Sequence, residues 1–187
     1  MLYRISFVVI LTCSLWGQNN ILSVTDDVVA SGDTLWLEID LENTDNVYGA
    51  QFDLEYEMVF SFLDTFQVTE RLIGFNAEVE LVGGGTRILL YNANLNPITP
   101  GFGAIIRVGY FSEPVYGDYT FEIQNGVLGN ASSENILTDV SNGIISLDSP
   151  APLISDFSQI SFNEDTNLLI LRTDLENNTT DIDTPIE

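Results

Sequence analysis

Pairs of carboxylates are the residues of this chain best suited to acid–base chemistry. Glu55 and Glu57, like Glu78 and Glu80, are spaced by two residues, which puts both acids of a pair on one face of a β-strand. Two acids about 5 to 9 Å apart across a sugar can hydrolyse a glycosidic bond. Because the chain holds 28 Asp and Glu, such pairs also arise by chance. We therefore favour a solvated surface and rank a carboxylate-based glycoside hydrolase third among the functions considered.

Most other catalytic chemistry is excluded by residues that the sequence lacks. The chain has no His and no Lys, and its one cysteine, Cys13, lies in the first apolar segment. Serine and cysteine triads, Schiff-base lysines and histidine zinc sites are therefore excluded once that segment is removed. The sequence predicts a binding protein that is not an enzyme and that has no metal or cofactor of its own.

Trp36 is the candidate residue for carbohydrate binding. It alternates with Leu35 and Leu37 and stands beside Glu38 and Asp40, which indicates an exposed ring able to stack on a sugar. Packing under a loop or in the core is an equally good interpretation. Tyr110, Tyr116 and Tyr119 are candidates to extend the same aromatic surface.

The charge balance excludes two classes of partner. With 28 acidic residues against five arginines, the formal net charge is −23. Nucleic acid and anionic membrane surfaces are recognised by clustered Lys and Arg, which this chain does not have. High solubility is the simplest consequence of such a charge.

The N-terminal segment has the features of a secretory signal peptide. A short positive start is followed by an apolar stretch over residues 5–11 and a cleavage region at residues 14–17. The apolar stretch is shorter than the about 20 residues that a membrane span needs. We expect residues 1–17 to be removed and the chain to be secreted, to the medium or the cell surface, with lipidation at Cys13 left open.

The rest of the chain predicts an all-β domain. Apolar residues recur with period two between clusters of Gly, Asn, Asp and Pro, and no segment of useful length has helical periodicity. The nine expected strands form a jelly-roll β-sandwich over residues 18–148. They cover residues 21–29, 34–41, 47–56, 58–69, 76–82, 86–92, 104–111, 119–125 and 143–147.

Residues 149–187 form a proline-bearing linker and an acidic tail. The polar segments at 163–166 and 174–176 resemble the opening of a cadherin-like surface repeat, and a disordered tail explains them nearly as well. Their oxygens suit calcium, so we expect a calcium site only where a following repeat supplies further ligands.

Several segments, in this order, resemble the cohesin family, the receptor modules of cellulosome scaffolds. The segments that carry the resemblance are residues 30–34, 48–56, 87–91, 101–108 and 141–145. The resemblance implies a nine-stranded jelly roll and a non-catalytic role in protein assembly during polysaccharide degradation. The implied partner is a dockerin-like module; direct binding to a polysaccharide, as a carbohydrate-binding module or surface adhesin, is the alternative, and we expect a monomer.

In cohesins the dockerin lies on a sheet face that includes the third and sixth strands. The resemblance therefore implies a partner-binding surface formed by Gln51, Asp53, Glu55, Arg87 and Tyr91. Gly49 and Gln51 stand where cellulosomal cohesins often carry Asn and Asp, so this chain departs from the family at two positions of that surface.

Overall fold

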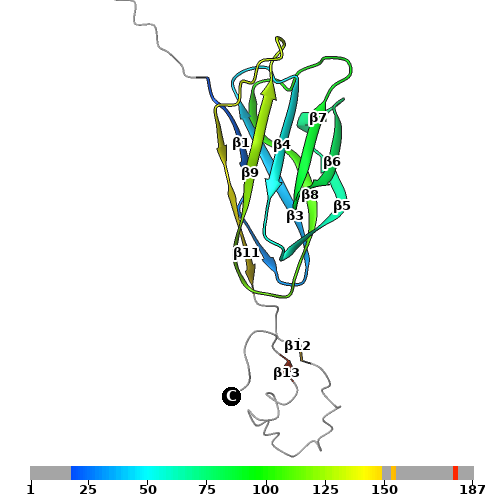
Figure 1. The fold of residues 1–187 in the computed structure, drawn as a ribbon, viewed down its shortest axis with the longest axis vertical. Helices are drawn as coiled ribbons and strands as arrows, with labels where there is room; N and C mark the ends of the chain where they lie inside the picture. The colour runs from blue at the N-terminus through cyan, green and yellow to red at the C-terminus, as the bar shows by residue number, and fades with distance from the viewer. Residues whose placement is uncertain (1–17, 149–152, 155–178, 181–187) are drawn as a thin grey trace, which may run out of the picture.

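The protein is a sandwich of two β-sheets, and its computed structural model describes residues 18–148, 153–154 and 179–180. The strands run along the long axis of the sandwich (Figure 1). One sheet has five strands and the other has six, in a jelly-roll arrangement.

Each sheet combines strands that are distant in sequence. Across the five-stranded sheet the order is β10 (Asp139–Ser141), β1 (Asn20–Val24), β3 (Thr34–Asn43), β8 (Gly101–Ser112) and β5 (Phe60–Val68). Across the six-stranded sheet it is β2 (Asp27–Ala30), β11 (Gly143–Asp148), β9 (Gly117–Gly129), β4 (Gly49–Glu55), β7 (Gly85–Tyr91) and β6 (Asn76–Val82). Neighbours pair antiparallel except β1 with β10 and β2 with β11. A 3-10 turn, η1 (Glu70–Leu72), follows β5.

The core lies between the sheets because apolar residues alternate along the strands. In β3 the alternation is complete, with Leu35, Leu37 and Ile39 fully buried between exposed or half-buried neighbours. The centre is aromatic: the rings of Tyr110 and Phe121 lie 5.1 Å apart. Because the inward side chains fill the core, the outward side chains of each sheet form a surface that is available for binding.

The two main sheets hold eleven strands, so the expected count of nine was wrong. The segment 21–29, predicted as one strand, divides into β1 and β2, which join different sheets. Asp26 lies at the break, where its carboxylate accepts a hydrogen bond from the backbone N–H of Ile144 at 2.7 Å. The strand β10, in a stretch predicted to be turns, accounts for the other addition.

The glycine hairpin between β6 and β7 is confirmed. Gly83 and Gly84 adopt φ values of +66° and +120°, which only glycine adopts readily. Gly85 opens β7 so close to β4 that a Cβ there would lie 2.3 Å from the carbonyl oxygen of Leu54. The glycines therefore serve the turn and the close approach of β4.

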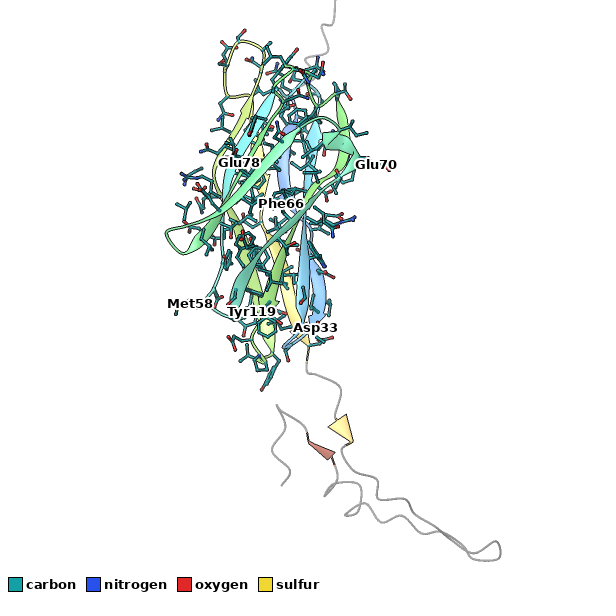
Figure 2. All side chains as sticks on the ribbon, turned by 90° about the vertical axis from the view of Figure 1, so that its right-hand side faces the viewer. Asp33, Met58, Phe66, Glu70, Glu78 and Tyr119 are labelled. Carbon is teal, nitrogen blue, oxygen red and sulfur yellow. The ribbon has the colours of Figure 1, made fainter. Side chains whose placement is uncertain are left out.

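The edge strands β5 and β6 lie on one side of the sandwich, which faces the viewer in Figure 2. Phe66 sits in the middle of this side and is 37 % exposed. The backbone of β5 is irregular here, with Asp64 at φ +52°. Such an irregularity discourages pairing of this edge with another chain.

Several predicted features lie outside the described residues. These are the signal peptide at residues 1–17 with Cys13, and the polar segments at 163–166 and 174–176 with their calcium and cadherin-like interpretations. Within the tail, β12 (Leu153–Ile154) pairs with β13 (Thr179–Thr180). Among the described residues no helix has the length and apolarity needed to cross a membrane.

Candidate functional site

The five predicted partner-binding residues share one surface. In the register of β4 with β7, Asp53 is opposite Arg87 and Gln51 is opposite Leu89, so the side chains of these four residues point to the same side of the sheet. Tyr91, two residues after Leu89 on β7, points to that side too. We call the outward side chains of β9, β4, β7 and β6 the six-strand face. The structure therefore brings Gln51, Asp53, Glu55, Arg87 and Tyr91 together on the six-strand face.

An ion pair occupies the centre of the six-strand face. Arg87 donates from Nε to Asp53 Oδ1 at 2.7 Å and from Nη2 to Asp53 Oδ2 at 2.8 Å. Asn125 donates to Asp53 Oδ2 at 2.9 Å. The hydrogen bonds from Arg87 hold the pKa of Asp53 below its usual value, although burial opposes that shift. Asp53 is thus a partner of Arg87 more than a free acid, and Arg87 is the exposed member of the pair.

A bulge in β9 brings Asn125 to Asp53. The pairing of β4 with β9 shifts register between Gln51 and Asp53. At this point Asn125 adopts φ +52°, a conformation that Asn tolerates better than most residues. The bulge re-aims the Asn125 amide towards the ion pair, which is a common use of bulges near functional sites.

Tyr91 and Glu78 form a second polar contact at the same surface. The Tyr91 hydroxyl donates to Glu78 Oε1 at 2.9 Å, and this hydrogen bond raises the pKa of Tyr91. Tyr91 remains 38 % exposed. Its ring is therefore held in place by Glu78 while one side stays open to a ligand.

An apolar hollow of about 500 Å³ lies beside Tyr91. Its apolar side chains include Leu89, Leu95 and Val127, of which Leu95 is 73 % and Val127 41 % exposed. A smaller hollow of about 220 Å³ shares Gln51 and Leu89 with it. A single surface thus offers an apolar depression next to charged groups.

Acids border the smaller hollow and the strand beside it. Glu78, Glu80 and Arg87 line the smaller hollow, and Glu55 stands directly opposite Glu122 across β4 and β9. Like charges in opposite positions repel one another unless a cation lies between them. The six-strand face is therefore suited to a partner that carries positive charge.

The opposite surface of the sandwich carries Trp36. We call the outward side chains of β1, β3, β8 and β5 the five-strand face. Trp36 is 38 % exposed there, as the sugar-binding interpretation requires. The prediction that Tyr110 extends this aromatic surface was wrong, because Tyr110 is fully buried in the core. Tyr110 follows the inward set of β8, in line with Ile106 and Val108.

The carboxylate pairs proposed for acid chemistry lie at the surface. Glu78 and Glu80 project from the edge strand β6, and Glu55 and Glu57 are exposed at the end of β4. Within the described residues there is no group of three or more metal-ligating side chains.

Three residues of the hollow were missed by sequence reasoning. Leu89 belongs to the predicted strand 86–92, but nothing in the sequence indicated which of its alternating sets faces outward. Val127 lies in a stretch predicted to be turns, whereas β9 continues to Gly129. Leu95 lies in the loop after β7 and adopts φ +55°. The one sequence signal for Leu95 was that it is an apolar residue in an otherwise polar loop.

Comparison with solved structures identifies the fold. A non-cellulosomal cohesin from the hyperthermophilic archaeon Archaeoglobus fulgidus aligns with a TM-score of 0.61 and 13 % identity, over 70 % of this chain and 92 % of that one. This chain has the cohesin fold. No family model and no curated protein matches the sequence.

Two further cohesins come from complexes with dockerins. A type I cohesin of Clostridium thermocellum aligns with a TM-score of 0.61 and 11 % identity, over 71 % of this chain and 95 % of that one. The sixth cohesin of scaffoldin B from Acetivibrio cellulolyticus, bound to a mutant Cel5 dockerin, gives a TM-score of 0.60 and 12 % identity, over 70 % and 99 %. The predicted all-β cohesin-like sandwich is confirmed.

Proposed function

We propose that this protein is a non-catalytic binding module that recognises a dockerin-like protein partner through its six-strand face. The observation that carries the proposal is the apolar hollow of about 500 Å³ beside the Arg87–Asp53 pair. Protein interfaces gain most of their affinity from a few buried anchors surrounded by polar contacts. Two of the solved cohesins with this fold were crystallised with dockerins, which supports the same class of partner.

The contacts on the six-strand face assign a different role in binding to each of its residues. The hollow receives an apolar side chain of the partner against Leu89, Val127 and Tyr91. Arg87 is oriented by Asp53 and offers its remaining donors to the partner. Gln51 lies between these regions and lines both hollows. Glu55, opposite Glu122, supplies the negative charge that attracts a basic group.

The proposed setting is extracellular, in an assembly that degrades polysaccharides. The signal-like segment at residues 1–17 and the strongly acidic composition support secretion of a monomeric, soluble module. Gly49 and Gln51 replace the Asn and Asp that cellulosomal cohesins often carry, so we expect a partner with its own specificity.

Isothermal titration against a panel of purified dockerins, including type I modules, tests the proposal. Leu89→Asp places a charge in the hollow and should weaken binding by about tenfold or more, because a central anchor is lost. Gln51→Ala should weaken binding to a smaller extent.

Ile144→Asp is the matched control. Ile144 lies on β11 of the same sheet, is 49 % exposed and is outside both hollows. It should leave affinity unchanged. If no dockerin binds the wild-type protein, or if Leu89→Asp and Ile144→Asp behave alike, the proposed interface is wrong.

A further inference from the structure

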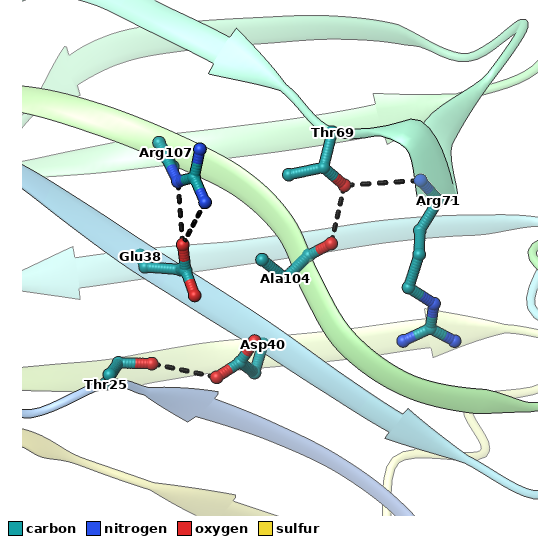
Figure 3. A network of polar contacts seen from close by, with 7 residues as sticks. All are labelled: Thr25, Glu38, Asp40, Thr69, Arg71, Ala104 and Arg107. Carbon is teal, nitrogen blue, oxygen red and sulfur yellow. Dashed lines mark hydrogen bonds and ion pairs between the residues drawn. The ribbon is translucent and has the colours of Figure 1, made fainter.

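Three polar side chains form a row across the five-strand face, and none of them packs into the core. Arg107 on β8 is opposite Gln67 on β5 and opposite Glu38 on β3. The Nε and Nη2 atoms of Arg107 each lie 2.7 Å from the same oxygen, Glu38 Oε2 (Figure 3). Within residues 18–148 no hydrogen bond engages Glu38 Oε1, Arg107 Nη1 or the Gln67 amide. The row therefore offers a ligand an acceptor on Glu38, a donor on Arg107, and the amide of Gln67, which can both donate and accept a hydrogen bond.

Trp36 lies next to this row and leans over the sheet. Its register partner is Gly109, where a Cβ would lie 3.6 Å from Cζ3 of the indole and 2.5 Å from Cγ2 of Thr65. Because glycine leaves this space free, the indole reaches from β3 across the backbone of β8. It is nevertheless 38 % exposed, and Phe111, two residues along β8, is 37 % exposed. The face thus presents aromatic surface directly beside hydrogen-bonding groups.

A hollow of about 460 Å³ lies on the other side of the polar row. Gln67 and Arg107 line it together with Phe102, which is 71 % exposed. Its volume is within the range of about 300 to 1,000 Å³ that small-molecule sites occupy. From Phe102 to Phe111 the strand spans about 30 Å, at roughly 3.4 Å per residue. An extended ligand can therefore contact aromatic rings at both ends and the polar row between them.

These observations select the chemistry of the ligand. A pyranose ring presents C–H groups on its faces, which pack on an aromatic ring, and hydroxyls on its rim, which both donate and accept hydrogen bonds. An anionic ligand is disfavoured, because Glu38, Asp40 and Glu42 follow one another along the outward side of β3. The glycan with the most regular apolar faces is a β-linked chain whose hydroxyls are all equatorial.

We propose that the five-strand face binds a neutral β-1,4-linked glucan or xylan chain, which stacks on Trp36 and hydrogen-bonds to Gln67, Arg107 and Glu38. This function is separate from the proposed recognition of a protein partner. The two faces lie on opposite sides of the sandwich, so both ligands can bind at once. The module then holds its protein partner against a polysaccharide.

Titration with cellohexaose and with xylohexaose, together with affinity electrophoresis in hydroxyethylcellulose and xylan gels, tests this assignment. The wild-type protein should bind at least one of the two hexasaccharides, and Trp36→Ala should reduce the affinity by about tenfold or more, since stacking is lost. Trp36→Phe should restore part of the affinity, which separates loss of stacking from loss of folding. Circular dichroism and thermal unfolding of each variant complete that control.

Tyr91→Ala is the matched control, because Tyr91 has the same exposed fraction of 38 % but lies on the six-strand face. It should leave glycan binding unchanged, and Leu89→Asp should do so too. If the wild type binds neither hexasaccharide, or if Trp36→Ala binds as well as the wild type, the assignment is wrong. Loss of dockerin binding in Trp36→Ala would place a protein on the five-strand face and would also overturn it.

Discussion

On the six-strand face Arg87 uses two nitrogens to hold both oxygens of Asp53, whereas on the five-strand face two nitrogens of Arg107 converge on one oxygen of Glu38. Asp53 has a further donor in Asn125 and is nearly buried. Side chains of the second pair are 48 % and 31 % exposed. We call the first pair closed, because both oxygens of Asp53 accept hydrogen bonds and hold Arg87 in one orientation. We call the second pair open, because Glu38 Oε1 accepts no hydrogen bond within the described residues and stays available to a ligand.

A third arginine extends the comparison. Among the described residues, no carboxylate lies within ion-pair distance of Arg71 on η1. Its guanidinium donates instead to backbone carbonyl groups and to one amide oxygen. Burial lowers its pKa, although Asp40 opposes that shift. Arg71 therefore serves as a structural clamp, Arg87 belongs to the closed pair, and Arg107 belongs to the open pair.

Arg71→Met should have the largest effect of the three substitutions. Arg71 donates to the carbonyl groups of Leu41, Gly103 and Thr99 and to Asn43 Oδ1, which joins the ends of β3 and β8 (Figure 3 shows its position). Methionine keeps the aliphatic stem but leaves these acceptors unpaired. We expect the free energy of unfolding, measured with urea, to fall by about 2 to 3 kcal/mol.

Arg71→Lys is the control for charge alone. An ammonium group cannot span acceptors on both strands as the guanidinium fork does. The lysine variant should therefore lie between the wild type and Arg71→Met. If the free energy of unfolding of Arg71→Met falls by less than about 1 kcal/mol, water replaces the hydrogen bonds of Arg71 at little cost and the proposed clamp is wrong.

Asp53→Asn should have an intermediate effect that depends on pH. Since Arg87 lowers the pKa of Asp53 in the folded state, the stabilisation is complete above the unfolded pKa, near about 4, and disappears as the pH falls through the lower folded value. At pH 7 we expect a loss of about 1 kcal/mol, since Arg87 is partly exposed.

Urea unfolding at pH 7 and at a series of lower pH values, through the unfolded pKa of about 4 and below it, checks the sign. The difference between wild type and Asp53→Asn should shrink as the pH falls and the wild-type carboxyl takes up its proton. A difference that stays constant would mean that the Asp53 charge does not stabilise the fold. Asn125→Ala should reproduce a smaller part of the loss, because it removes one donor to Asp53.

Much of the fold was predictable because the signals are local. The alternation in β3 indicates both the strand and its buried face, and the glycines at 83–85 predict the hairpin. The division of residues 21–29 was not predictable, since neither Gly nor Pro marks it and only the pairing with different sheets separates β1 from β2. β10 likewise depends on its parallel pairing with β1.

The sequence around Asn125 shows how local chemistry can mislead. Asn-Gly at 125–126 is typical of a turn, so the predicted strand ended there. In the structure the same pair forms a bulge inside β9, with Asn125 held by Asp53 and Gly126 packed against Leu137. A left-handed backbone at Asn125 is compatible with a turn and with a bulge, and the pairing of β9 with β4 determines that it is a bulge.

The candidate site was predictable in part for the same reason. Gln51, Asp53 and Glu55 alternate with apolar residues, which placed them on one surface. The sequence did not indicate which face of β7 points outward, and only the register of β7 with β4 places Arg87 beside Asp53. The hollow required Leu95 and Val127, which come from a loop and a lengthened strand. Its apolar character arises only when these distant segments meet.

Arg107→Gln should have the smallest effect on stability and so tests whether the five-strand face is free for a ligand. Both partners are substantially exposed, and exposed ion pairs typically contribute about 0.2 to 1 kcal/mol, because water and salt screen the charges. We expect a change at the lower end of this range by urea unfolding, and a double-mutant cycle with Glu38→Gln should give a coupling that weakens as salt is added. The same variant should lose affinity for the hexasaccharides. A loss of stability approaching that of Arg71→Met would instead make the Arg107–Glu38 pair part of the framework, and the contrast between a closed and an open arginine pair would then fail.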